Sequence, residues 1–317
     1  MAIDEKPDYL HVASLSEADS QKPRWLVDSL WLSEAVGIIG GAPKSCKSWL
    51  CLDLAVSVAS QTPCLGRFSV NHAGTALIYL AEDSLAAVKA RIEGICKSRS
   101  LNLKDIELYT ITASSLRLDA EADQNRLRAM VEKLKPRLLV LDPLVRLHRL
   151  DENNASEMSG LLSFFRKLQR EFQMAIILVH HAGKRSHARA GLNLRGSTDL
   201  HAFGDSNLYL FRKGDEIEVT IEHRSAAAAD PLKLHLKDDH NAPHLAMMGA
   251  ELQSGLSLTI DEQILRHLSK SPSPITREKL RATLKIKNER LGESLKELEI
   301  IGKIIHRQNG WIANLSL

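Results

Sequence analysis

The stretch of sequence that most constrains this chain is a short turn rich in glycine and lysine, residues 40–48, with the sequence GGAPKSCKS. It follows the apolar run 35–39 and precedes residues 49–56, whose apolar side chains recur at helical spacing. A strand, a tight loop and a helix in this order are typical of a loop that binds phosphate, because backbone N–H groups and the helix N-terminus face the anion. We expect the following residues to contact a nucleotide: Gly41, Ala42, Pro43, Lys44, Ser45, Cys46, Lys47, Ser48 and Trp49.

Two side chains of this loop have specific expected roles. In the pattern G-x-x-x-x-G-K-[ST], the lysine reaches the β- and γ-phosphates and the hydroxyl binds Mg²⁺. Lys47 and Ser48 occupy these positions, whereas Cys46 stands where the pattern has its second glycine. A thiol beside a helix N-terminus and two lysines is expected to have a lowered pKa. The motif alone also fits a lysine-rich turn without nucleotide.

Composition excludes several classes of protein. The 317 residues are 44% hydrophobic and 26% charged, with a net charge of +3, which is ordinary for a folded chain. No run approaches the roughly 18 apolar residues of a membrane span, and the N-terminus does not resemble a signal peptide. The four cysteines match no zinc or redox spacing. We therefore expect a cytoplasmic protein with reduced thiols.

Two later strands end in acidic residues. The strand 75–80 ends at Ala-Glu-Asp-Ser, where Glu82 is placed to orient or deprotonate an attacking water, although Asp83 or Ser84 could instead cap the next helix. The strand 137–142 is apolar and closes on Asp142, the layout of a Walker B strand that delivers a carboxylate to Mg²⁺. The sequence thus predicts an ATP and Mg²⁺ site at one sheet edge.

Three further motifs point to a family. Residues 142–154 read DPLVRLHRLDENN, residues 174–184 form a strand that ends in His-His with a lysine beyond it, and residues 195–199 read RGSTD. Together they resemble the RepA-like branch of RecA-fold ATPases found in plasmid and phage replication proteins. The resemblance covers about residues 25–237. It implies an α/β fold with a mainly parallel sheet flanked by helices, assembled as a homo-oligomeric ring, commonly a hexamer, with ATP between subunits.

The resemblance also implies roles for individual residues. Glu82 becomes the catalytic carboxylate and His181 the sensor of the γ-phosphate. Packing against the sheet edge is the plain alternative for both His180 and His181. Residues 219–224 are similar to the strand that carries an arginine finger in ring helicases, which gives Arg224 that role in the neighbouring subunit. Such helicases often carry a lysine two residues earlier, where this chain has Glu222, and Arg212 is the competing candidate.

Basic residues mark two candidate DNA contacts. Residues 182–194 are basic and lack apolar periodicity, and in a RecA-like ring this loop faces the central channel, so Lys184, Arg185 and Arg189 are expected to touch single-stranded DNA. A solvated surface loop is the plain alternative. No aromatic residue interleaves with these charges, so base stacking is not indicated.

A second folded unit is expected near the C-terminus. Residues 1–22 look like a flexible leader, 23–237 the ATPase domain, 238–257 a linker and 258–317 a small domain of three helices and a hairpin at Asn309-Gly310. This pattern predicts a winged helix-turn-helix, with eleven Lys and Arg residues against seven Asp and Glu. Protein contacts are the alternative use. The residues expected to face duplex DNA are Lys285, Lys287, Arg290 and Arg307.

The sequence therefore predicts a Mg²⁺-dependent ATPase that acts on DNA as a helicase or translocase. The alternative is a nucleotide-gated DNA-binding regulator with little or no ATP turnover, in which Cys46 has weakened hydrolysis. A separate hypothesis makes Cys46 a redox switch, because oxidation would add bulk and polarity in the phosphate loop. A small-molecule kinase is disfavoured because it leaves the basic loop and the C-terminal unit without a use.

Overall fold

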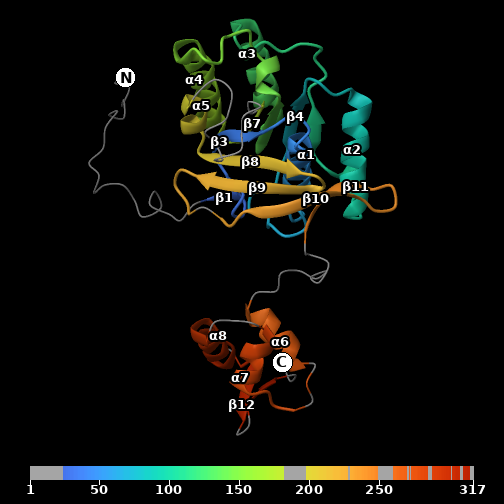
Figure 1. The fold of residues 1–317 in the computed structure, drawn as a ribbon, viewed down its shortest axis with the longest axis vertical. Coiled ribbons are helices and arrows are strands. Elements are labelled where there is room, and N and C mark those ends of the chain that lie inside the picture. The colour runs from blue at the N-terminus through green and yellow to red at the C-terminus, as the bar shows by residue number, and fades with distance from the viewer. Residues whose placement is uncertain are drawn as a thin grey trace, which may run out of the picture. The chain divides into compact units, whose positions relative to one another are not determined.

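A computed structural model describes most of the chain and divides it into two compact units, 1–249 and 250–317. The described residues are 24–181, 198–227, 229–248, 260–269, 271, 273–284, 288–300, 302–307 and 310–314. The first unit contains the large sheet and the second contains three helices and a hairpin (Figure 1).

The first unit is built around a nine-stranded sheet in the order β11-β10-β9-β8-β3-β7-β6-β4-β5. The six strands from β8 to β5 in this order are parallel, whereas β8, β9, β10 and β11 pair antiparallel at one side. Helices cover both faces of the central strands, so these strands carry apolar side chains on both faces. The strands are β3 (Val36–Gly41), β4 (Ala76–Leu80), β5 (Leu108–Thr110), β6 (Leu138–Asp142), β7 (Ala175–His181), β8 (Ser206–Lys213), β9 (Glu216–His223), β10 (Leu232–Asp238) and β11 (Pro243–Met247).

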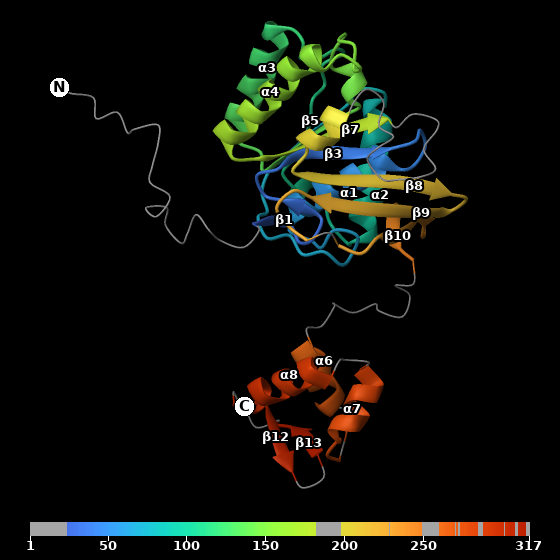
Figure 2. The same ribbon diagram turned by 60° about the vertical axis from the view of Figure 1, so that its left-hand side comes forward.

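Helices lie on both faces of this sheet. One face packs against α1 (Lys47–Ser60) and α2 (Leu85–Ser98), and the other against α3 (Glu121–Leu134) and α4 (Ala155–Phe172). Figure 2 shows α3 and α4 together on one side of the sheet. This arrangement confirms the predicted α/β class with a mainly parallel, helix-flanked sheet. The remaining elements are α5 (Thr198–Phe203), the short 3-10 helices η3 (Leu103–Asp105) and η4 (Leu144–Arg146), and a separate hairpin of β1 (Trp25–Val27) and β2 (Trp31–Leu32).

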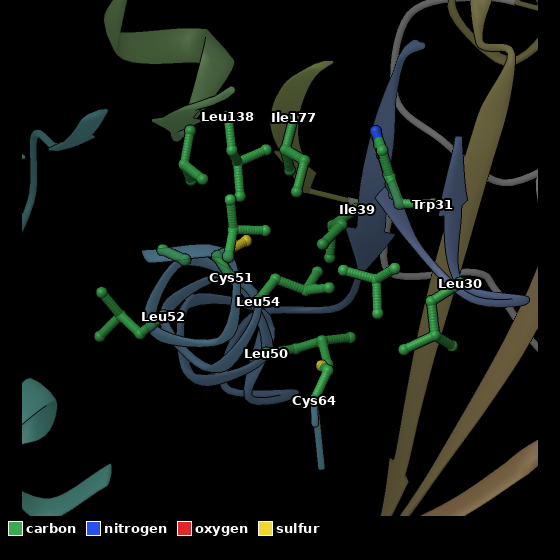
Figure 3. Close-up of a cluster of buried hydrophobic side chains, with 14 of the residues drawn as sticks. Leu30, Trp31, Ile39, Leu50, Cys51, Leu52, Leu54, Cys64, Leu138 and Ile177 are labelled. Atoms are coloured by element: carbon green, nitrogen blue, oxygen red, sulfur yellow. The ribbon is translucent and has the colours of Figure 1, made fainter. Parts of the chain in front are cut away.

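Side chains from the sheet and from α1 form one hydrophobic core. Ile39, Leu138 and Ile177 come from three neighbouring strands and point toward Leu50 and Leu54 of α1 (Figure 3). All five are at most 1% exposed. Burial of a large aliphatic side chain contributes about 1.5 to 3 kcal/mol, so this contact holds α1, and with it the loop before it, against the sheet.

The expected linker is partly structured. Residues 243–247, which the sequence analysis assigns to a linker, form β11 and pair with β10 at the sheet edge. The sequence pattern of β11 is a weak indication of a strand, because the segment is short and begins with Pro243. Proline is tolerated in sheets only at such edges. The expected leader 1–22 lies outside the described residues.

The second unit has its own small core. It consists of α6 (Ile260–Ser269), α7 (Arg277–Leu284), α8 (Asn288–Ile300), β12 (Ile304–Arg307) and β13 (Gly310–Ala313). The buried members of its core are Ile264, Leu268, Ile275, Leu280, Leu291, Leu295, Leu298 and Ile304. The predicted three helices and hairpin are therefore present. Among the described helices of the whole chain, none is both long and apolar enough to cross a membrane.

A buried ion pair joins α1 to α2. Asp53 and Arg99 have side chains that are 2% and 12% exposed, and their charged groups lie 2.6 Å apart. Asp53 also accepts a hydrogen bond of 2.8 Å from the backbone N–H of Leu65, and Arg99 donates to Ser57 at 2.8 Å. This network fixes the middle of α1 against the following turn and the residue that ends α2.

We expect Asp53→Ala to lower the free energy of unfolding by about 3 kcal/mol or more, because it leaves the Arg99 guanidinium buried without its partner. Urea denaturation measures the loss. The control is Glu34→Gln, which breaks an exposed ion pair with Arg24 and should cost less than about 1 kcal/mol. Equal losses in the two variants would contradict this account of the helix contact.

Candidate nucleotide site

The loop between β3 and α1 has the backbone of a tight, partly left-handed turn. Lys44 and Cys46 have φ of 64° and 67°, and Cys46 is the residue immediately before α1. The left-handed region costs an L-residue about 1 to 2 kcal/mol. Glycine avoids this cost, which explains why the usual motif has glycine at the position of Cys46.

Gly41 at the start of the loop is required for a steric reason. A Cβ on this residue would lie 2.4 Å from the carbonyl oxygen of Leu210 and 2.9 Å from the Ser45 hydroxyl. The backbones of β3 and β8 therefore approach closely here, and the end of β8 lies beside the loop.

Lys47 and Ser48 are held in place before any ligand binds. The Lys47 ammonium is buried and donates to the carbonyl oxygens of Gly41 at 3.0 Å and Ala42 at 2.8 Å. Burial lowers the Lys47 pKa, and the nearby Asp142 carboxylate partly opposes this effect. Burial likewise raises the pKa of Asp142 to about 6, although a hydrogen bond from Ser48 and the charge of Lys47 both lower it.

Alternation along the strands brings the predicted residues to one face. On β7, Ile177 and Val179 face α1, so His181 does so too; on β6, Val140 faces α1 and so does Asp142. His181 also pairs in register with Gly41 of the phosphate loop. The carboxyl ends of parallel strands meet at one sheet edge, so these side chains converge without any long loop.

The converging side chains line one cavity of about 440 Å³. Its walls include the predicted residues Lys44, Ser45, Cys46, Lys47, Ser48, Trp49, Glu82, Asp142 and His181. The structure thus brings together most of the residues that the sequence assigns to nucleotide binding and hydrolysis. Their individual roles stay predictions.

Several cavity residues have partners that the sequence analysis did not predict. Glu82 accepts a hydrogen bond of 2.8 Å from Arg146, and Asp83 pairs with Arg91 at 2.6 Å. Ser84, not Asp83, caps α2, since its hydroxyl accepts from the Ala87 N–H at 3.2 Å. Asp83 lies before the N-cap of α2 and eight residues from Arg91, which is too far for a pair along one helix face, so sequence spacing could not have revealed this contact.

Arg212 of β8 lies in the cavity and is close to the phosphate loop. Its guanidinium donates to the Lys44 carbonyl at 3.4 Å and lies 3.7 Å from the Cys46 sulfur. The expected low pKa of Cys46 is wrong: burial raises it, and this effect outweighs the charges of Arg212 and Lys47. A raised pKa means little thiolate at neutral pH, so the structure does not favour a reactive thiol here.

The oxygen atoms of Ser48 and Asp142 fit a magnesium ion. Asp142 is 6% exposed, and its Oδ2 has no hydrogen-bond partner among the described residues. Mg²⁺ is typically bound by one or two protein oxygen ligands together with substrate phosphates and water. This pair of side chains beside the phosphate loop matches that donor set.

Arg224 is not part of this cavity. It follows β9, which runs antiparallel to β8, and therefore lies at the sheet edge opposite the phosphate loop. Its guanidinium lies 3.3 Å from Asp205 and also donates to the carbonyls of Ala202 and Phe203. Within one chain the structure does not bring Arg224 to the nucleotide, and its role across a subunit boundary stays a prediction.

The predicted DNA contacts fall largely outside the described residues. Lys184, Arg185, Arg189, Lys285 and Lys287 all lie there. Arg290 belongs to α8, and Arg307 is exposed on β12 in the second unit. These DNA contacts stay predictions.

Sequence comparison identifies the family. The profile of a family described as an AAA domain, AAA_25, matches residues 5–187, more than half of the chain. The chain belongs to this AAA domain family. A search among curated proteins gave no significant match.

Solved structures similar to this AAA domain protein share its fold. They include the ATPase domain of G40P, which is 14% identical with a TM-score of 0.50; the match covers 67% of this chain and 84% of that chain. The RadB recombinase is also 14% identical with a TM-score of 0.50, and the match covers 67% of this chain and 90% of that chain. A DnaB-like replicative helicase is 15% identical with a TM-score of 0.50. That match covers 67% of this chain and 57% of the helicase chain. The chain therefore shares the fold of these three structures.

We expect Cys46→Gly to tighten binding of an ATP analogue several-fold, because glycine adopts the left-handed backbone of this position without strain and frees space near the phosphates. Cys46→Ala is the matched control, since it removes the thiol but keeps the strain. Isothermal titration with Mg-ATPγS measures both. An equal gain in the alanine variant would assign the effect to the thiol and contradict the backbone explanation.

Proposed function

We propose that this AAA domain protein is a Mg²⁺-dependent ATPase of the RepA-like branch, which acts on DNA as a helicase or translocase in plasmid or phage replication. The observation that carries the proposal is the cavity of about 440 Å³ in which Lys47, Ser48, Glu82, Asp142 and His181 meet. These residues come from the start of α1 and from the ends of β4, β6 and β7, and together they make up the parts that phosphoryl transfer to water requires.

Each residue has a distinct part in hydrolysis. Lys47 exchanges its contacts with the loop carbonyls for the β- and γ-phosphates and neutralises their charge. Glu82, oriented by Arg146, accepts a proton from the attacking water. His181 contacts the γ-phosphate and reports its loss to the segment that follows β7. Ser48 and Asp142 would hold Mg²⁺, which offsets negative charge on the phosphates.

The proposed assembly is a homo-oligomeric ring, favoured as a hexamer, with Arg224 of one subunit directed at the nucleotide of the next. A guanidinium at that place stabilises transition-state charge on the phosphates. The position of Arg224 at the sheet edge away from its own phosphate loop is compatible with action in a neighbour and not in its own chain.

DNA is the proposed polymer partner. The basic loop with Lys184, Arg185 and Arg189 would follow a single strand in the ring, while the C-terminal unit, as a winged helix-turn-helix, would contact duplex through Lys287, Arg290 and Arg307. The fold shared with a replicative helicase and a recombinase supports an ATPase core suited to this task.

A second candidate function is a nucleotide-gated DNA-binding regulator. The observation in its favour is Cys46, which strains the phosphate loop where glycine would not. In this case ATP would control assembly and duplex binding, with negligible turnover.

The test of the proposal is steady-state ATP hydrolysis with Mg²⁺, with and without single-stranded DNA. We expect turnover that DNA stimulates several-fold and that Lys47→Ala reduces at least a hundredfold, because the lysine neutralises charge on the transferred group. ATP binding without turnover, accompanied by tight duplex binding, would favour the regulator. No Mg-ATP binding at all would contradict both candidates.

The ring arrangement is tested by mixing two inactive variants. We expect Lys47→Ala and Arg224→Ala each to lose turnover, and an equal mixture to regain a measurable part of it, because some interfaces then combine an intact loop with an intact arginine. Arg212→Ala mixed with Lys47→Ala is the comparison, since Arg212 lies in its own subunit's cavity. Recovery with Arg212→Ala but not with Arg224→Ala would contradict the assignment.

A further inference from the structure

A buried cluster of three titratable side chains includes His180, the neighbour of His181 on β7, and has no part in the proposed hydrolysis. It consists of Glu152, His148 and His180, whose side chains are 14%, 1% and 2% exposed. Glu152 Oε1 lies 3.3 Å from His180 Nε2 and 3.6 Å from His148 Nε2. Burial by itself would raise the Glu152 pKa, but the two nearby imidazoles lower it to about 2, so the carboxylate is ionised at neutral pH.

The cluster joins two segments of the chain that each have one end at the cavity. One is the segment from Asp142 to the start of α4, which carries His148 and Glu152. The other is β7, which carries His180 and then His181. The contact of Glu152 with His180 therefore links the segment that begins at Asp142 to the end of β7.

Strand alternation makes His180 an anchor for His181. His180 shares the face of Ile176 and Leu178, which pack with α4, whereas His181 shares the opposite face with Ile177 and Val179. A side chain held at one position of a strand fixes the backbone of the next. Glu152 thus acts on the cavity face through one peptide unit, although it does not line the cavity itself.

The turn around Glu152 is rigid for reasons of its own. Asn154 caps α4 by accepting hydrogen bonds from the N–H groups of Ser156 at 3.1 Å and Glu157 at 3.4 Å. Asp151 accepts from the Asn153 N–H at 2.9 Å. Asp151 and Asn154 thus stabilise the local backbone, which leaves Glu152 as the member of this acidic and amide-rich run that turns inward to the histidines.

Stability alone is a poor explanation for this cluster. Buried charged groups lose solvation, and replacing them with well-packed apolar residues is often neutral or stabilising. Four buried atoms of the cluster have no hydrogen-bond partner among the described residues, which adds to the cost of burying them: Glu152 Oε1, His148 Nδ1, His148 Nε2 and His180 Nδ1. A free-energy cost of burial beside the nucleotide cavity is consistent with a cluster that positions a residue of that cavity.

We propose that Glu152 is a positioning residue that holds His180, and through it sets the place of His181 against the γ-phosphate. This inference rests on the proposed function, since it assumes that the cavity binds ATP. It predicts that loss of the Glu152 charge impairs discrimination between tri- and diphosphate nucleotide, because only the triphosphate has the group that His181 contacts.

The test is a double-mutant cycle of Glu152→Gln and His181→Ala, read as the ratio of ADP to ATPγS dissociation constants with Mg²⁺ in isothermal titrations. The preference for ATPγS should fall about tenfold in each single variant, because His181→Ala removes the contact with the charged γ-phosphate and Glu152→Gln lets His181 move away from it. The double variant should lie within about twofold of His181→Ala, because residues that act through one contact are not additive.

Leu168→Ala is the control for general destabilisation, since Leu168 is 1% exposed on α4 and packs on the same side of the sheet as His180. It should lower thermal stability and leave the nucleotide preference unchanged. An unchanged preference in Glu152→Gln, or a double variant that multiplies the two losses, would overturn the positioning role alone. Failure of the parent to bind either nucleotide would overturn the proposed function and this inference together.

Discussion

The structure depends on one geometric constraint, the meeting of parallel strand ends at a single edge of the sheet. Because β3, β4, β6 and β7 all run in the same direction, each delivers its last residues to this edge. The period of two along each strand then decides which of these residues face α1 and the phosphate loop. Asp142 and His181 reach the cavity for this reason, and His180 is directed to the opposite layer.

The phosphate loop itself is held by packing and not by its own conformational preference. Lys44 and Cys46 both occupy left-handed backbone, which is unfavourable for side chains of this kind. The compensation comes from the apolar contacts of α1 with the sheet and from the ion pair of Asp53, in the middle of α1, with Arg99. A loop stabilised in this way can present Lys47 and Ser48 before nucleotide arrives.

The main elements of the fold and of the site could be predicted from the sequence. Apolar runs followed by Lys47, Glu82 and Asp142 reflect strands buried on both faces, and such strands have strong local signals. β11 could not be predicted, since a five-residue edge strand beginning at Pro243 differs little from a loop.

The contacts between individual side chains could not be predicted from the sequence for a different reason. Glu152 lies 28 residues before His180, and Arg146 lies 64 residues after Glu82, so only the folded sheet brings them together. The pKa of Cys46 was predicted in the wrong direction because the neighbouring charges are visible in the sequence, whereas the burial that outweighs them is not.

The central claim is that these strand ends form a site for Mg-ATP. The most direct measurement is a crystal structure of the protein with Mg-ATPγS. The account predicts that the γ-phosphate lies within hydrogen-bond distance of Lys47 and His181, with Mg²⁺ held by Ser48 and Asp142. A nucleotide bound elsewhere, or phosphates that do not contact Lys47, would contradict it.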